Sequence, residues 1–429
     1  SGFPAPANDG RLVFTYPEEL SPQLDRRFGQ YELQVYESYE PGKEQAFIDA
    51  CKRVAEIHWE AAHWLAKTQS WDCLAFVSLT IDRASHYLWR FMDPDHPEYD
   101  RGQADCWGGA IRDLYCLEDG HLGRLLEVVG EDDLVLVTSD HGFCGRHRTF
   151  YINEWLRRKG YLKLKGRLVE RGWLGRLMTP VVDLYQRNAW ARSLMAPLRG
   201  TAARDRLMSH HHAHRRGRLR METVPIDWDR TVAYAADQHR IYLNEQAYDF
   251  QGEAFTKRYD EVLAQLADEL DDITDDRGNP LSADVLKGRD IYDGPFVEEG
   301  PDLLVFFDNY RCDVNSSLGG SLFGESSLRL SGTHHPHGLI MMRGPGVRPE
   351  QRIEADIVDI APTILHALDA PVLAESDGQP IWAAFDEASE FSRRPVRQIS
   401  HAERARKEQA WSAEEEAEVM GRLRELGYL

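Results

Sequence analysis

No apolar run in the sequence approaches the roughly 20 residues that a helix needs to cross a bilayer. Its six cysteines are scattered and show no CxxC spacing, so a disulfide scaffold is not expected. The first ten residues, SGFPAPANDG, contain neither a basic n-region nor an apolar h-region and predict no signal peptide at this end. Together these features favour a cytoplasmic protein with reduced thiols.

Basic residues are fewer than acidic residues in this sequence. Lysine and arginine number 51 against 71 acidic residues, which gives a formal net charge of -20. Such a charge argues against general affinity for nucleic acid and favours solubility, although one basic segment described below leaves that exclusion open. The length of 429 residues is enough for two or three folding units.

Four short runs of strand-forming residues are present. They are LAFVSLT (74–80), LVLVTS (134–139), DLLVFF (302–307) and GLIMMRG (338–344). Each is almost continuously apolar, as is typical of strands covered on both faces. Helical patterns precede the first two runs and follow the last. This alternation predicts an α/β protein with three layers, α/β/α, around a mostly parallel central sheet, in which functional groups gather at the carboxyl ends of the strands.

The segment 157–226 differs from its surroundings. It is rich in basic residues, has few acidic ones, and carries apolar residues such as Trp173, Leu177 and Val181 at helical spacing. We interpret it as a helical cap inserted between two parts of the core, 1–156 and 227–385, and we expect a surface helix or tail over 386–429. The basic residues of the cap have two explanations: they bind a phosphate group of the substrate, or they form a solvent-exposed surface without a ligand.

Acidic and imidazole side chains accompany three of the strand-forming runs. They are Asp82 and His86, Asp140 and His141, and the loop histidines His334, His335 and His337. Each group alone has a structural explanation, as a pair on a helix surface, an N-cap and turn, or a solvated loop. Their coincidence at one edge of the predicted sheet favours a site for zinc, manganese or a similar divalent ion. Two adjacent ions would polarise a phosphoryl oxygen and stabilise both attacking and leaving oxygens.

The ordered motifs TIDRASH, VTSDHGF, SGTHHPHG and ADIVDIAPTIL resemble those of the type I phosphodiesterase/nucleotide pyrophosphatase family in the alkaline phosphatase superfamily. The resemblance extends from about Gly2 to the carboxyl terminus. It implies an alkaline-phosphatase-like fold and hydrolysis of a small-molecule substrate, a phosphodiester or a nucleotide pyrophosphate. It also implies two divalent metal ions, with zinc expected before manganese.

The resemblance also implies roles for individual residues. Asp82, His86 and His334 match the ligands of one metal, and Asp140 with His141 match two ligands of the other. His335 and His337 are expected behind the ligands or facing the substrate.

The nucleophile of the family has no match in the sequence. The family pattern has a strand ending in Asp-Gly and then a Thr or Ser at a helix start. Asp9 and Gly10 with Thr15 are too closely spaced, and Thr80 and Ser139 lie in predicted strands. We therefore expect the nucleophile in a segment upstream of Ser1, either removed or present as a separate amino-terminal fragment. The alternatives are a non-catalytic binding or assembly protein, or a phosphomonoesterase, mutase or sulfatase of the same superfamily.

Overall fold

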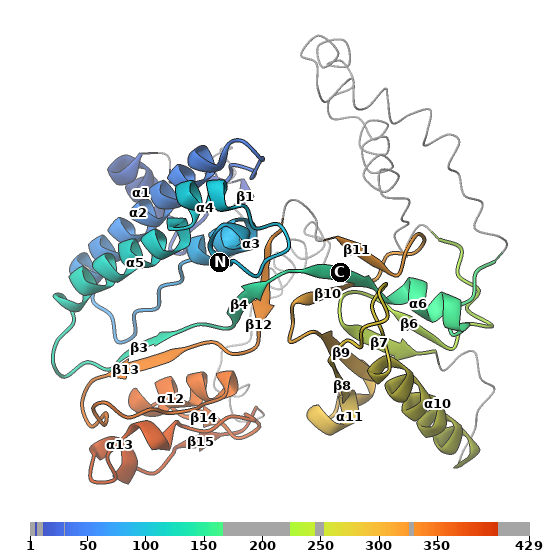
Figure 1. The fold of residues 1–429 in the computed structure, drawn as a ribbon. Helices are drawn as coiled ribbons and strands as arrows, with labels where there is room; N and C mark the ends of the chain where they lie inside the picture. Colours follow the sequence, from blue (N-terminus) through green and yellow to red (C-terminus); the bar gives the residue numbers. More distant parts are fainter. Residues whose placement is uncertain are drawn as a thin grey trace.

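A computed structural model of the chain describes residues 5–6, 12–29, 31–165, 224–244, 253–325 and 330–401. Figure 1 shows two lobes joined by a narrow pair of strands. We call them the helical lobe, which contains α1–α5 together with the carboxyl-terminal elements, and the sheet lobe, which contains the largest β-sheet. No helix in the described ranges is long and apolar enough to cross a membrane.

The helical lobe begins with five helices. They are α1 (Leu20–Phe28), α2 (Glu44–Thr68), α3 (Thr80–Met92), α4 (Arg101–Trp107) and α5 (Ala110–Leu126). Before them lies a short antiparallel pair, β1 (Ala5–Pro6) and β2 (Leu12–Val13). Helices α2, α3 and α5 share one apolar core, in which Phe47, Leu88 and Leu114 are almost completely buried. Burial of such side chains contributes about 1.5–3 kcal/mol each, and it holds α3 firmly in place.

Two consecutive strand pairs lie beside this core. Strand β3 (Val135–Thr138) pairs with β13 (Ile340–Arg343), and β4 (Gly142–Gly145) pairs with β12 (Gly332–His335). Both pairs are antiparallel, so residues 135–145 run against residues 332–343. The register places His334 opposite Phe143. Segments about 200 positions apart in the sequence are therefore adjacent, β3 and β13 within the helical lobe and β4 and β12 at the joint between the lobes (Figure 1).

The sheet lobe is built on a mixed seven-stranded sheet. Its strands are β5 (Arg148–Tyr151), β6 (Ala233–Ala235), β7 (Arg240–Leu243), β8 (Ala283–Lys287), β9 (Leu303–Phe307), β10 (Cys312–Asn315) and β11 (Phe323–Glu325). The order is β11-β5-β10-β9-β7-β6, and β8 also pairs with β9. Helices α6 (Ile152–Lys159) and α10 (Glu253–Asp271) flank it. Phe150, Leu266 and Phe307 fill the core between them.

The remaining elements are short. In the sheet lobe they are α11 (Gly288–Ile291) and η4 (Val297–Glu299). In the helical lobe they are η5 (Ile357–Asp359), α12 (Ile360–Ala367), β14 (Val372–Leu373), η6 (Trp382–Ala384), α13 (Glu390–Arg393) and β15 (Gln398–Ile399). A small apolar core, which includes stacked Phe385 and Phe391 rings, holds this carboxyl-terminal part together.

Three of the four predicted strands are present as β3, β9 and β13. The strand predicted over 74–80 is wrong: residues 73–79 form no strand, and Thr80 already begins α3. A strand requires a ladder partner for its backbone groups, and no described segment pairs with this run. The side chains of Val77 and Leu79 are consequently 73% and 57% exposed.

The predicted mostly parallel central sheet is not confirmed. Among the described strands only β5 with β10 and β14 with β15 pair in parallel, and the other pairs are antiparallel. Strand β12 runs antiparallel to β4, and β13 runs antiparallel to β3. Crossover connections of the βαβ type would have made these pairs parallel. Most of the predicted cap, residues 166–223, and the tail from 402 onward lie outside the described residues, so the predicted domain division stays a prediction.

Candidate metal site

Helix α3 carries the first two predicted ligands, Asp82 and His86, one turn apart on its exposed side. Its first residue is anchored by a buried carboxylate: Thr80 Oγ1 donates a hydrogen bond of 2.7 Å to Glu118 Oε1. The same carboxylate accepts a bond of 2.6 Å from Trp59 Nε1. The anchor ties the start of α3 to α2 and α5. Because Asp82 lies two residues further on, its position along the helix is fixed by buried contacts.

Strand β12 lies directly against this helix, and a glycine makes the approach possible. A Cβ atom on Gly332 would lie 2.3 Å from the carbonyl oxygen of Ser85, closer than any carbon–oxygen contact tolerates. The backbone N–H of Ser331 donates to the carbonyl of His86 at 2.7 Å. These contacts position His334, two residues along β12, over the exposed side of α3.

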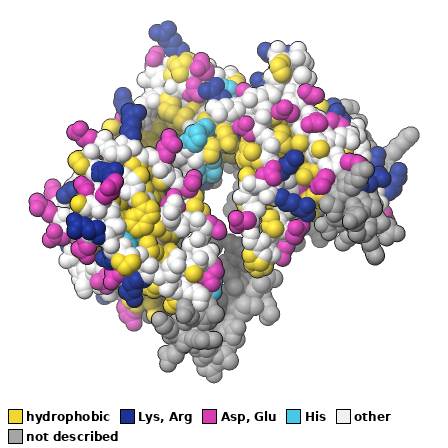
Figure 2. Space-filling view, turned by 90° about the horizontal axis from the view of Figure 1, so that it is seen from below, with side chains coloured by type: hydrophobic (Ala, Val, Ile, Leu, Met, Phe, Trp, Pro, Cys, Tyr) yellow, Lys and Arg dark blue, Asp and Glu magenta, His cyan; other side chains and the backbone are white. Residues whose placement is uncertain are grey.

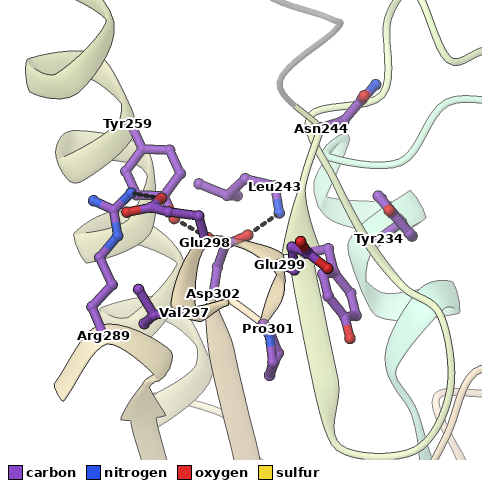
Figure 3. Close-up of a pocket in the computed structure, with 12 residues that line it drawn as sticks. Tyr234, Leu243, Asn244, Tyr259, Arg289, Val297, Glu298, Glu299, Pro301 and Asp302 are labelled. Carbon is purple, nitrogen blue, oxygen red and sulfur yellow. Dashed lines mark hydrogen bonds and ion pairs between the residues drawn. The ribbon is translucent and has the colours of Figure 1, made fainter. Parts of the chain in front are cut away.

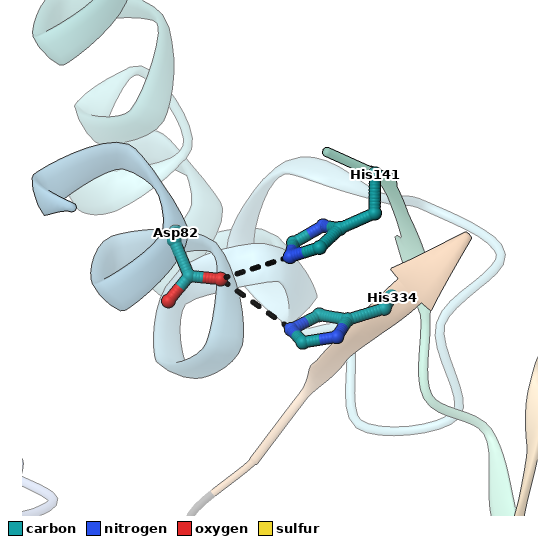
Figure 4. Close-up of side chains that lie close together, drawn as sticks. All are labelled: Asp82, His141 and His334. Atoms are coloured by element: carbon teal, nitrogen blue, oxygen red, sulfur yellow. Dashed lines mark ion pairs between the residues drawn. The ribbon is translucent and has the colours of Figure 1, made fainter. Parts of the chain in front are cut away.

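The candidate ligand atoms converge on one carboxylate oxygen. Asp82 Oδ1 lies 3.4 Å from His334 Nε2, 3.6 Å from His86 Nε2 and 3.8 Å from His141 Nε2. Figure 4 shows Asp82 facing the rings of His141 and His334. Ligand atoms around a tetrahedral zinc lie roughly 3.3 Å apart, because each metal–ligand bond is about 2.0–2.1 Å long. The spacing therefore fits ligands of a divalent ion.

No other group in the described part of the chain matches this arrangement. Asp82, His141 and His334 each offer one ligand atom, and the three atoms lie within 4.8 Å of one another. Such a group of three or more histidine, cysteine, aspartate or glutamate side chains occurs nowhere else among the described residues. Figure 2 shows histidine side chains beside the hollow between the two lobes.

The second nitrogen of two imidazoles is positioned as a metal ligand requires. His86 Nδ1 lies 3.2 Å from the carbonyl of Gly332, and His141 Nδ1 lies 3.1 Å from the carbonyl of Gly142. A proton on Nδ1 makes each contact a hydrogen bond and leaves the Nε2 lone pair facing Asp82. Metal-binding histidines usually donate their other N–H in this way, which fixes both tautomer and ring orientation.

Electrostatics also favour a neutral imidazole at His334. Burial lowers the pKa of His334, and nearby His141 and His86 lower it further, while Asp82 opposes the shift. The rings of His141 and His334 stack with centroids 3.7 Å apart, and the Nε2 atoms of His86 and His334 are 3.0 Å apart. A neutral His334 ring keeps a lone pair for a cation, whereas a protonated ring has none.

Asp140 and the two remaining loop histidines lie at or beyond the border of the cluster. Asp140 Oδ1 is 3.6 Å from His141 Nε2, but its side chain is 77% exposed. His335 packs edge-on against Tyr310, with ring centroids 5.1 Å apart, and also contacts His337. The structure thus groups His141 with Asp82 and His334 as well as with Asp140. The division of the five residues between two metals stays a prediction.

Phe143 is a residue of the site that the sequence did not single out. Its ring meets those of His86, His141 and His334 edge-on at centroid distances of 4.9, 5.4 and 5.2 Å. It forms an apolar wall that limits the orientations of all three imidazoles. Its place two residues after His141, in the strand β4 that begins directly after that histidine, is the only sequence signal that could have identified it.

Comparison with known proteins gives one match. A family model described as type I phosphodiesterase / nucleotide pyrophosphatase matches residues 14–289. The matched range contains Asp82, His86, Asp140 and His141, and it ends before His334. Searches of curated proteins and of solved structures gave no match.

Proposed function

Because the chain belongs to the type I phosphodiesterase / nucleotide pyrophosphatase family of the alkaline phosphatase superfamily, we propose that it is a metal-dependent hydrolase. Its substrate would be a phosphodiester or a nucleotide pyrophosphate. The convergence of Asp82, His141 and His334 within 4.8 Å is the observation that carries the proposal. Family membership supports phosphate ester hydrolysis in general, and the cluster supports its dependence on a metal.

We further propose two divalent ions, zinc or manganese. Asp82, His86 and His334 would hold one ion, and Asp140 and His141 would contribute to the other. A divalent ion bound there supplies a Lewis acid for a phosphoryl oxygen. The anchored helix α3 and the close packing of β12 hold the ligands in place before any ion binds, which reduces the cost of ordering them.

Other residues of the chain would exclude water and hold the substrate. The Phe143 ring packs edge-on against the three imidazoles and is proposed to keep water from that side of them. His335 and His337 continue from the ligand strand and are proposed to face the substrate. Basic residues of the segment 157–226 are proposed to hold a substrate phosphate; of this segment, residues 166–223 lie outside the described part of the chain.

The nucleophile, a Thr or Ser outside the sequence given above, stays a prediction. A separate amino-terminal fragment that supplies it would be a partner of this chain. The run 73–79 supports such a partner, because it has the composition of a strand and no described segment pairs with it. An added strand would pair its backbone groups.

The metal half of the proposal is tested by elemental analysis and calorimetric titration with zinc and manganese. The chain is expected to bind a divalent ion, His334→Ala to lose it, and His337→Ala to retain it, since His334 belongs to the group of clustered ligand atoms and His337 does not. If the unmodified chain binds no divalent ion, or if both variants bind equally, the site assignment is wrong.

The reaction is tested with bis(p-nitrophenyl) phosphate beside p-nitrophenyl phosphate and p-nitrophenyl sulfate. Turnover is measured on this chain and, where the coding sequence continues upstream of Ser1, on the longer product. We expect little turnover of the diester by this chain alone, because no nucleophile is identified in it. In the longer product we expect the diester to be preferred, and turnover to stop on chelation and return with zinc or manganese. Turnover that survives chelation would refute the metal mechanism. A metal-bound longer product that cleaves none of the three esters would favour the non-catalytic alternative.

A further inference from the structure

The loop that joins α3 to α4 contains a buried histidine outside the metal cluster. His96 is 3% exposed, and both of its ring nitrogens lie against backbone groups. Its Nδ1 is 3.0 Å from the backbone nitrogen of Glu98, and its Nε2 is 3.1 Å from the carbonyl oxygens of both Arg146 and Ser331. Each polar atom of the ring therefore has a partner within the folded chain, as buried polar groups require.

These partners determine which nitrogen of the ring carries the proton. A backbone N–H can only donate, so the Nδ1 that faces Glu98 is the acceptor, and Nε2 carries the proton that the two carbonyls share. Burial lowers the pKa of His96, and this outweighs the opposite effect of Glu98, the two carbonyls and Asp93. A second proton, on Nδ1, would point at the N–H of Glu98. The surroundings thus favour a neutral ring that donates from Nε2.

The two carbonyls belong to the strands that carry candidate metal ligands. Ser331 directly precedes β12, three residues before His334. Arg146 directly follows β4, five residues after His141. The single N–H of His96 therefore bridges the two strands at the end of their ladder, where β4 leaves the helical lobe.

Two glycines lie opposite each other beside this bridge. Gly145 is paired with Gly332 in the ladder of β4 and β12, and this pair contributes no side-chain contact between the strands. A Cβ atom on Gly145 would lie 2.8 Å from Oδ2 of Asp93, so the loop after α3 packs directly on the strand backbone. The loop therefore holds the strand pair by backbone packing and by the bridge from His96.

Ser331 connects the bridge to α3. Its backbone N–H donates a hydrogen bond of 2.7 Å to the carbonyl of His86, one of the candidate ligands on that helix. Its own carbonyl accepts from His96 and also from the backbone N–H of Arg146, at 2.8 Å. The three elements that carry candidate ligands, α3, β4 and β12, thus meet at one buried residue.

Arg146 continues the connection into the sheet lobe. Its side chain is buried, forms an ion pair with Asp313 of β10, and places Nη2 3.2 Å from the hydroxyl oxygen of Thr149. The cavity of about 270 Å³ in the same lobe, shown in Figure 3, is lined by other residues. The joint is therefore held by His96 from the helical lobe and by a buried ion pair from the sheet lobe.

We propose that His96 is a positioning residue of the metal site, whose Nε2–H bridge holds β4 and β12 in place relative to α3. It thereby sets the distances between Asp82, His141 and His334. This inference rests on the metal site of the proposed function. His96 is no ligand, because both ring nitrogens are engaged, but metal sites tolerate deviations of only about 0.2 Å in ligand distance. Loss of the bridge therefore weakens metal binding while every ligand remains.

The test compares two amides that retain opposite halves of the imidazole. His96→Gln places an amide N–H where Nε2 donates, whereas His96→Asn places an amide oxygen where Nδ1 accepts and leaves the bridge empty. Zinc affinity is measured by calorimetry, and backbone hydrogen exchange is measured on the metal-free chain. We expect His96→Asn to lower zinc affinity about tenfold and to speed exchange over residues 142–147 and 331–335. His96→Gln should retain most of the affinity and the slow exchange.

A second buried histidine provides the control. His366 is 2% exposed, and its Nε2 lies 2.8 Å from the carbonyl oxygen of Phe391 in the carboxyl-terminal core. His366→Asn removes a comparable buried hydrogen bond away from the ligand strands. It should lower the urea midpoint of unfolding as His96→Asn does, but leave zinc affinity unchanged. This difference separates positioning of the site from a general loss of stability.

Three outcomes would overturn the proposal. They are an equal loss of zinc affinity in His96→Asn and His96→Gln, unchanged zinc affinity in His96→Asn, and a loss in His366→Asn as large as in His96→Asn. A folded His96→Gln that has lost zinc overturns it even where His96→Asn does not fold. If the unmodified chain binds no zinc, the proposed metal site itself fails. Exchange then tests the bridge alone: equal exchange in the two His96 variants overturns it, and faster exchange only in His96→Asn supports it.

Discussion

Replacement of Gly332 by alanine should damage the metal site without touching any ligand. The added Cβ would lie 2.3 Å from the carbonyl oxygen of Ser85 and 3.2 Å from Cβ of Trp89. An ordinary carbon–oxygen contact is about 3.3–3.6 Å, so β12 must move away from α3 by roughly 1 Å. Both neighbours are rigid, since one is helix backbone and the other is the first side-chain atom of a packed tryptophan.

Two measurable consequences are expected from Gly332→Ala. Forced overpacking of this kind costs about 1–3 kcal/mol of unfolding free energy, which urea denaturation measures. Metal sites tolerate deviations of only about 0.2 Å in ligand distance, and His334 moves with the strand. We therefore expect zinc affinity, measured by calorimetry, to fall at least tenfold.

A matched glycine provides the control. Gly123 lies in α5, and a Cβ there would meet nothing within 4 Å. Gly123→Ala should therefore stabilise the protein by about 0.5–1 kcal/mol through helix propensity and leave zinc affinity unchanged. If Gly332→Ala binds zinc like the unmodified chain and unfolds at the same urea concentration, the close packing of β12 on α3 does not position the site.

The sheet lobe supports two further predictions. Burial by itself would raise the pKa of Glu154, but hydrogen bonds from Arg157 and Arg158 lower it below its ordinary 4.5. The ionised Glu154 therefore stabilises the folded protein fully above pH 4.5, and this contribution is lost as the pH falls through the lowered pKa of the folded state. Glu154→Gln should lower the free energy of unfolding by about 1–3 kcal/mol at pH 7. It should also weaken the fall of the urea midpoint with decreasing pH, and an unchanged fall would count against this ion cluster. Leu266→Ala, at a fully buried position of α10, should lower the free energy of unfolding in urea by about 2–5 kcal/mol. Asp268→Ala, at an exposed position of the same helix, should change it by no more than about 0.5 kcal/mol. Equal effects of the two substitutions would contradict the packing of α10 on the sheet.

Local patterns were sufficient to predict several elements of this protein. Continuous apolar runs of strand-forming residues identified β3, β9 and β13, of which β9 has three buried residues and β3 and β13 are only partly buried. The four-residue spacing of Asp82 and His86 placed both side chains on one side of a helix turn. The pairing of acidic and imidazole side chains with strand ends indicated a metal site before any distance was known.

The failures share a different cause. Residues 74–80 have the composition of a strand, but strand formation depends on a partner elsewhere in the chain, and composition carries no information about it. The antiparallel register of residues 135–145 with 332–343 was likewise invisible, because pairing partners about 200 positions apart leave no local pattern. The expectation of mostly parallel pairing rested on alternating elements alone.

The sequence by itself determined which side chains are able to hold a metal, since ligand chemistry belongs to the residue type. Only the tertiary structure decided which of them meet. It brought His334 across to Asp82 through the contact of Gly332 with Ser85, placed Phe143 against three imidazoles, and left Asp140 at the exposed border. The physical reason is that convergence depends on strand register and close backbone packing, which are properties of distant segments in contact.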